Sequence, residues 1–150
     1  MSSRFSSSLP IFSGEFRHAL DEKNRITIPA RWRQGETDEF FLRPDRTASF
    51  LFVMPTDEFK KVAEVAAASV SPKDHRVFIR HFYSGSTHCT TDRQGRLVLP
   101  DEYCRQLKFK ADVMLVGTHE RFEIWNSAKW KQTQNDEAQI FARVADLVGL

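Results

Sequence analysis

The chain has 150 residues, of which 41% are hydrophobic, and its formal net charge at pH 7 is only +2. This small charge excludes a histone-like polycation, and no apolar run approaches the length of a membrane span. Two cysteines, Cys89 and Cys104, are too few for a disulfide framework, so we expect free thiols in a reducing compartment.

Residues 1–14 are rich in serine and lack the continuous apolar core of a secretory signal. We expect this segment to be a flexible N-terminal arm and the protein to stay in the cytoplasm. The rest of the chain is long enough for one domain, or for two small domains that share a core.

A twelve-residue motif recurs 71 positions further along the chain, at residues 21–32 and 92–103. Each copy has an Asp, an Arg four residues later, two aliphatic residues, a Pro and a large aromatic residue. The same offset continues downstream, since Leu51, Val53 and Met54 fall on the apolar residues Phe122, Ile124 and Trp125. A fixed offset over about forty residues indicates tandem duplication.

The duplication defines the expected organisation of the chain. Repeat 1 covers residues 15–58 and repeat 2 covers residues 86–129. A helical bridge at residues 59–85 joins them, and residues 130–150 form a C-terminal helix.

Hydrophobic periodicity predicts the same order of elements in both repeats. Residues 25–28 and 96–99 alternate, which gives short strands that turn their arginines away from the core. A Pro then starts a short helix, because its missing N–H costs nothing at that position. Two further strands follow in each repeat, at residues 40–42 and 49–54 and at residues 113–116 and 122–125.

Three longer helices complete the prediction. One runs to about residue 69 with Thr56 as a candidate N-cap, and one ends near Val148 with Ser127 as a candidate N-cap. A third covers residues 73–83 in the bridge. Its apolar side is formed by Val77, Phe78, His81 and Phe82.

Each motif begins with a loop whose residues favour a tight turn. The carboxylates of Asp21 and Asp92 can accept backbone N–H groups two or three residues further on. Asn24 and Gly95 tolerate a positive φ. An Asp four residues before an Arg can also hold the guanidinium in a salt bridge. We therefore assign these four residues to the structure of the loops.

A rigid loop that presents a guanidinium suits a phosphate group or the edge of a guanine base. Positive charge also collects around the motifs and the bridge, which favours a polyanionic partner. The candidate DNA-contacting residues are Lys23, Arg25, Arg31, Arg93 and Arg96. The alternative for any single arginine is that it only locks its loop.

The two motifs and their surroundings resemble the MraZ family of bacterial transcriptional regulators. The resemblance covers residue 14 to about residue 132. It rests on residues 14–29, 84–85, 92–100 and 122–125. It implies a mainly β fold with helices (α+β), in which two tandem SpoVT-AbrB repeats of one chain form a swapped-hairpin, AbrB-type double-split β-barrel.

The resemblance also implies a function. Such a protein binds double-stranded DNA at direct repeats in the promoter of the division and cell wall gene cluster. It acts mainly as a repressor, forms a ring-shaped homo-oligomer and associates with the nucleoid. The DNA-contacting positions fall on Arg25 and Arg96, with Lys23 as a basic neighbour. No cofactor is implied.

The chain departs from the family pattern at two places. Asn24 stands where Gly is usual, and Asn is the next best residue for a positive φ. In repeat 2, Gln94 stands where a basic residue is usual, and Arg93 is displaced by one position. We therefore expect repeat 1 to be the stronger contact with DNA.

One alternative is an antitoxin-like or scaffolding module that binds another protein. Its C-terminal helix would capture the partner, although packing on the barrel or on a neighbouring subunit is the commoner use of such a helix. The apolar positions of this helix are Trp130, Ile140, Phe141, Val144, Leu147 and Val148.

A second alternative is an enzyme or a metal protein. The potential ligands and nucleophiles are His75, His81, His88, Cys89 and Cys104. They show no paired metal-ligand spacing, so we expect neither a metal site nor catalysis.

Overall fold

The computed structural model describes residues 11–150, and residues 1–10 lie outside the described part. Its strands are β1 (Glu15–Ala19), β2 (Arg25–Thr27), β3 (Glu39–Pro44), β4 (Leu51–Pro55), β5 (Thr87–Thr90), β6 (Arg96–Val98), β7 (Asp112–Gly117) and β8 (Phe122–Asn126). Its helices are the 3-10 turn η2 (Ala30–Trp32), α1 (Thr56–Ser69), α2 (Pro72–Ser84), α3 (Asp101–Gln106) and α4 (Ser127–Val148). The predicted α+β class is confirmed.

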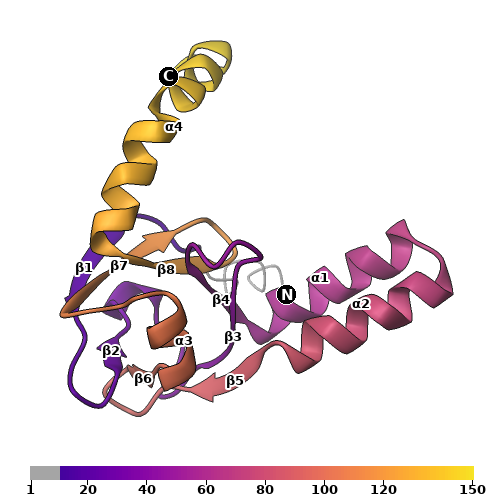
Figure 1. The fold of residues 1–150 in the computed structure, drawn as a ribbon, viewed down its shortest axis with the longest axis horizontal. Coiled ribbons are helices and arrows are strands. Elements are labelled where there is room, and N and C mark those ends of the chain that lie inside the picture. The colour runs from indigo at the N-terminus through magenta and orange to yellow at the C-terminus, as the bar shows by residue number, and fades with distance from the viewer. Residues whose placement is uncertain (1–10) are drawn as a thin grey trace, which may run out of the picture.

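Six strands form one sheet in the order β1-β7-β8-β4-β3-β5, and β2 pairs with β6 in a separate two-stranded ribbon. Every pairing is antiparallel. The repeats exchange their first strands, because β1 pairs with β7 of repeat 2 and β5 pairs with β3 of repeat 1. This is the interlocking expected of two swapped repeats in one chain (Figure 1).

The two central pairings are symmetric between the repeats. In the ribbon, Ile26 pairs with Leu97, its equivalent 71 positions later. In the sheet, Phe52 pairs with Glu123, which is again its equivalent. A residue that pairs with its own equivalent lies on the twofold axis that relates two copies. The repeats therefore face each other as two subunits of a dimer would.

The main core lies between the ribbon and the inner face of the sheet. Ile26, Ile28, Leu97 and Leu99 point inward from the ribbon and are buried against the sheet. The burial of four aliphatic side chains is worth roughly 1.5–3 kcal/mol for each of them. The same alternation leaves the opposite face of the ribbon at the surface.

Phe12, which lies in the predicted N-terminal arm, is packed in this core and is only 1% exposed. Its N–H donates to the carbonyl of His119 at 2.8 Å, and its ring meets that of Trp32 edge-on at 5.4 Å. Gly117 permits this approach, because a Cβ there would lie 2.5 Å from the carbonyl carbon of Phe12. The chain is thus anchored from Phe12 onward.

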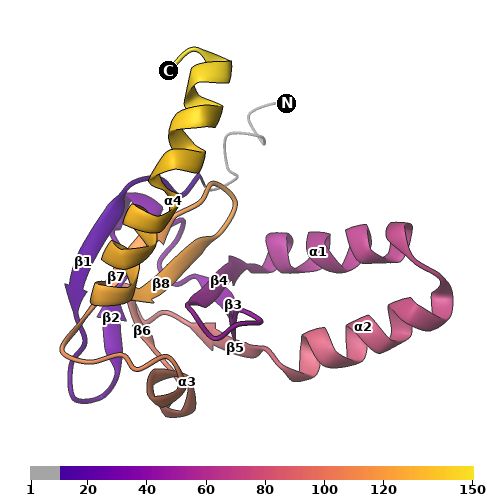
Figure 2. The same cartoon turned by 45° about the horizontal axis from the view of Figure 1, so that its top comes forward.

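Helices α1 and α2 form a hairpin that projects from the sheet, and α4 projects in another direction (Figures 1 and 2). Phe59 of α1 fixes the hairpin, since its ring stacks on Phe41 at 4.1 Å and on Phe82 at 4.4 Å. None of the helices within residues 11–150 is long and apolar enough to cross a membrane.

The base of α4 packs on the sheet face that points away from the main core, at Met114, Val116 and Trp125. The ring of Trp130 lies 5.3 Å from that of Trp125, and its Nε1–H donates to Glu15 at 3.3 Å. Beyond this contact the helix continues away from the sheet (Figure 2).

The C-terminal ends predicted for α1 and α4, near residues 69 and 148, are confirmed, but their predicted N-caps are wrong, and α4 begins before residue 130. Pro55 occupies the cap of α1, where no side chain makes a capping bond. Asn126 caps α4 and accepts the N–H of Lys129 at 3.1 Å. The hydroxyl of Ser127 donates to Asp112 at 2.9 Å instead, because Ser127 already lies inside the helix.

Helix α2 extends one residue beyond the predicted range at each end. Its predicted apolar side is only partly correct, because Phe82 is buried and Phe78 half-buried, whereas Val77 and His81 are exposed. Helix α2 packs on Phe59 through Phe78 and Phe82. Val77 and His81 lie on the neighbouring side of the helix, which stays in solvent.

Candidate nucleic-acid interface

One carboxylate holds the loop of repeat 1 in shape. Oδ1 of Asp21 accepts the backbone N–H groups of Lys23 at 2.9 Å and Arg25 at 2.8 Å. Oδ2 accepts the Nε–H of Arg25 at 2.7 Å. Because the guanidinium is fixed through Nε, its two Nη groups remain without a partner among residues 11–150 and can donate to a ligand.

The loop of repeat 2 has the same geometry. Asp92 accepts the backbone N–H groups of Gln94 and Arg96, both at 2.9 Å, and the Nε–H of Arg96 at 2.7 Å. The turn residue has a positive φ in both loops, +59° for Asn24 and +79° for Gly95. The two loops are therefore equivalent in backbone geometry, although their middle residues differ.

These bonds stabilise the ionised form of both carboxyls. The pKa of Asp21 is lowered by the backbone N–H of Arg25 and then by its guanidinium. The pKa of Asp92 is lowered in the same way by Arg96. Each loop thus carries a charged Asp–Arg pair at neutral pH. The Arg25 side chain is 29% exposed and that of Arg96 is 36% exposed, so both guanidinium groups reach the surface.

The ribbon places both arginines on one surface. Arg25 lies opposite Val98 and Thr27 lies opposite Arg96 in its register, so the arginines occupy diagonal positions. The residues whose side chains face away from the core are Arg25, Thr27, Arg96 and Val98. This surface joins the two loops into one candidate interface.

His18 of β1 supports the ribbon on one side only. Its Nδ1 lies 2.7 Å from the carbonyl of Ala19, and its Nε2 lies 3.3 Å from the backbone N–H of Thr27. A carbonyl only accepts and a backbone N–H only donates, so this geometry requires the neutral tautomer with the proton on Nδ1. Cys89 occupies the equivalent position in repeat 2.

The other basic candidates differ in their surroundings. Lys23 and Arg93 are exposed in the loops and have no ion-pair partner within residues 11–150. Arg31 lies on η2, where its Cζ is 5.1 Å from the centre of the Phe16 ring. The structure therefore brings four of the five candidates together on the loops and ribbon, and Arg31 belongs to the adjoining turn.

Arg33 is a further basic residue at this surface that the motif does not predict. Its Nε–H donates to the carbonyl of Ile28 at 2.9 Å, and the side chain lies against the loop of repeat 2. A Cβ on Gly95 would be only 2.4 Å from this Nε. The motif gave no signal for Arg33, because the position after the aromatic residue is Cys104 in repeat 2.

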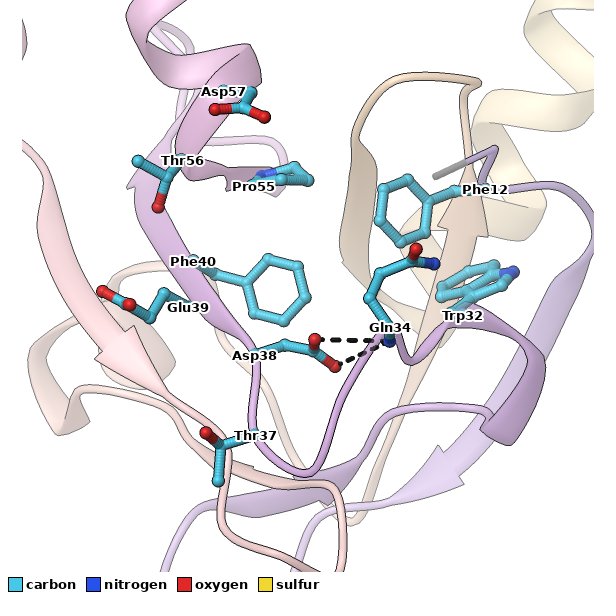
Figure 3. Close-up of a pocket in the computed structure, with 10 residues that line it drawn as sticks. All are labelled: Phe12, Trp32, Gln34, Thr37, Asp38, Glu39, Phe40, Pro55, Thr56 and Asp57. Carbon is cyan, nitrogen blue, oxygen red and sulfur yellow. Dashed lines mark hydrogen bonds between the residues drawn. The ribbon is translucent and has the colours of Figure 1, made fainter. Parts of the chain in front are cut away.

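A pocket of about 450 Å³ lies between Phe12, β3 and the start of α1 (Figure 3). Its lining includes the acidic residues Asp38, Glu39 and Asp57. The carboxylate of Asp38 accepts the backbone N–H of Gln34 at 3.1 Å, as the dashed lines mark. Negative charge on this wall disfavours a phosphate, and none of the five candidate contact residues lines the pocket.

The His and Cys residues within residues 11–150 form no group of three potential metal ligands. His88 contacts Glu39 at 2.7 Å. Burial, together with the charge of Asp101, raises the pKa of Cys104 to about 11, and burial also raises that of Cys89. Both cysteines are free and protonated at neutral pH, which is unfavourable for a nucleophile.

Comparison with known proteins finds the duplication again. The family model described as "MraZ protein, putative antitoxin-like" matches twice, at residues 11–81 and 82–149. The "Transcriptional regulator MraZ" of Natranaerobius thermophilus is 35% identical over 137 residues, which are 91% of this chain and 95% of that protein. The proteins of the same name from Desulforamulus reducens and Symbiobacterium thermophilum are each 34% identical over 91% of this chain, and the matches cover 96% and 99% of them. Both kinds of match extend over nearly the whole sequence, and the chain therefore belongs to the MraZ family.

Proposed function

We propose that the protein is a sequence-specific, DNA-binding transcriptional regulator without a catalytic role. The observation that carries this proposal is the pair of Asp-anchored arginines on the outward face of the ribbon. Each guanidinium is held through Nε and keeps its two Nη groups for a phosphate oxygen or a guanine edge. The names of the relatives, which are transcriptional regulators, support the same conclusion.

The interface consists of the two loops and the ribbon between them. A two-stranded ribbon fits the major groove, where its outward side chains reach the base edges. In this arrangement Lys23, Arg25, Arg93 and Arg96 contact DNA, and Arg31 contacts a flanking phosphate. Repeat 1 has Lys23 two residues before its arginine, where repeat 2 has Gln94, so the two loops differ in the side chain nearest the anchored guanidinium.

The proposal is tested by a mobility-shift assay on duplex DNA from the region upstream of the protein's own gene. Arg25→Ala and Arg96→Ala should each weaken the shift strongly, with the larger loss for Arg25→Ala. Arg46→Ala, at an exposed arginine in the turn between β3 and β4, is the matched control and should bind like the wild type. If Arg25→Ala binds normally while keeping the wild-type mass in size exclusion, Arg25 does not contact DNA.

The far half of α4 supports assembly into a ring-shaped homo-oligomer. Its apolar residues are exposed, Leu147 by 81% and Phe141 by 68%. Since α4 and the α1–α2 hairpin project in different directions, contact between α4 of one copy and the hairpin of the next is heterologous. Contacts of this kind generate a closed ring or an open filament. The hairpin offers exposed apolar residues of its own at Val65, Val70 and Val77.

Light scattering coupled to size exclusion tests this contact. Phe141→Asp should reduce the mass to that of a smaller species, whereas Gln139→Asp on the opposite side of α4 should leave it unchanged. If Phe141→Asp keeps the assembly but releases another protein that co-purifies with the wild type, α4 serves the alternative, antitoxin-like or scaffolding, function.

The MraZ relatives support a promoter as the target. We assign the protein to direct repeats in the promoter of the division and cell wall gene cluster, mainly as a repressor, in the cytoplasm and on the nucleoid. A ring that carries several ribbons can occupy several repeats at once. The second and later contacts then benefit from a high effective concentration.

A further inference from the structure

The outward face of the ribbon contains one apolar side chain, Val98, which is 55% exposed. It lies opposite Arg25 in the register and two residues after Arg96. The side chains within residues 11–150 leave much of it open to solvent, unlike the valines of the core. An exposed valine between two fixed guanidinium groups is suited to a ligand that is both anionic and apolar.

We propose that Val98 reads the 5-methyl group of a thymine in the major groove, and that its difference from Thr27 gives the binding site a direction. This proposal rests on the proposed DNA-binding function. The thymine methyl is the apolar group that the major groove displays, and apolar side chains recognise it. Valine offers only methyl groups, whereas Thr27, its equivalent in repeat 1, also offers a hydroxyl that can bond to other base edges.

The binding site on DNA has a direction because the two halves of the interface differ. A ribbon with perfect twofold symmetry would read both halves of its site alike and would favour a palindrome. Here the two halves differ in the reading residue, Thr27 or Val98, and in the loop residue, Lys23 or Gln94. The two ends of the site are therefore recognised by different chemistry, as direct repeats require.

A protein partner is a poorer occupant of this surface. Covering Val98 with another polypeptide would also remove Arg25 and Arg96 from water, and such desolvation of charged groups is costly. DNA supplies phosphates for both arginines and a methyl group for the valine.

The test starts from a random duplex library, from which the wild-type protein selects its preferred site. Each thymine of that site is then replaced by uracil, which removes the methyl group alone. At one position this change should weaken wild-type binding about fourfold, the value for one buried methyl-sized group. Val98→Ala should bind the thymine site about fourfold more weakly and should show no further loss on uracil. Ile11→Ala, at an exposed aliphatic residue outside the ribbon, should behave like the wild type on both duplexes.

Val98→Thr tests the direction, because it makes the two halves of the ribbon more alike and should shift the selected site towards a palindrome. The proposal is overturned if uracil costs Val98→Ala as much as the wild type at every position, or if Val98→Thr selects an unchanged site. It is also overturned if Val98→Ala loses its oligomeric mass, since Val98 is then a protein contact. Failure of the wild type to select any sequence overturns the proposed function itself.

Discussion

At the scale of single residues, each loop depends on one carboxylate that makes three hydrogen bonds. Two of them shape the backbone, and the third aims the guanidinium. Under the proposed function, an Asp in this position acts on DNA through its Arg. The sequence alone cannot distinguish a structural role of this pair in the loop from a role in DNA contact. An Asp and an Arg four residues apart fit both roles.

The substitution Asp21→Asn distinguishes the structural role of the carboxylate from its role in holding Arg25. The amide oxygen can still accept the backbone N–H groups, but a neutral side chain holds the guanidinium of Arg25 weakly. We expect DNA affinity to fall roughly tenfold, in keeping with the loss of one charge-assisted hydrogen bond. Fluorescence anisotropy on the upstream duplex measures this, with Asp57→Asn on exposed α1 as the control. Unchanged affinity would mean that Arg25 needs no anchor.

Acid should destabilise the wild type through the same two carboxyls. Their pKa values are lowered below the ordinary 3.8, so the stability from ionisation is complete above pH 3.8 and is lost as the pH falls through the lowered values. Urea unfolding at pH 6 and at pH 3 measures this loss. The double variant Asp21→Asn/Asp92→Asn should lose less stability between these pH values. An equal loss would assign acid sensitivity to other groups.

The two turn residues give a matched pair of substitutions. Asn24→Gly should be tolerated, because Gly adopts the same positive φ without strain. Gly95→Ala adds a left-handed alanine, which costs about 1–2 kcal/mol, and it also displaces Arg33. Thermal unfolding of both variants compares them directly. Equal melting temperatures would contradict the assigned role of Gly95.

At the scale of elements, the sequence predicted those strands and helices that have a clear hydrophobic period. Ile26 and Ile28 alternate with polar residues, and this pattern was sufficient to place β2 and its buried face. Strands β1 and β5 escaped prediction, because Thr87–Thr90 has no large apolar residue and Glu15–Ala19 has only Phe16. These two strands are held by pairing with the opposite repeat, which is a non-local property.

The hairpin of α1 and α2 should depend on Phe59, whose ring connects β3 to α2. Phe59→Ala is expected to reduce the free energy of unfolding by about 3–5 kcal/mol, as for other buried aromatic residues. Chemical denaturation measures this, and Lys60→Ala on the exposed side is the control. A change below about 1 kcal/mol would mean that the hairpin packs weakly on the sheet.

At the scale of the whole molecule, the duplication provides within one chain what a twofold dimer provides with two. Covalent linkage lets the copies diverge, and they have done so at the loops and on the ribbon, with Lys23 against Gln94 and Thr27 against Val98. The shared backbone geometry was predictable from the repeated motif. The outward position of Val98 follows from the alternation of residues 96–99, but the position of Arg33 was not predictable, because it depends on how the repeats meet.

The most direct test of the central claim is the salt dependence of DNA affinity for the wild type, Arg25→Ala and Arg96→Ala. If the Asp-anchored arginines contact phosphates, the logarithm of the affinity should fall steeply with the logarithm of the salt concentration. Each substitution should then reduce the slope by about one unit. A wild-type affinity independent of salt, or slopes unchanged in both variants, would contradict DNA binding through the ribbon.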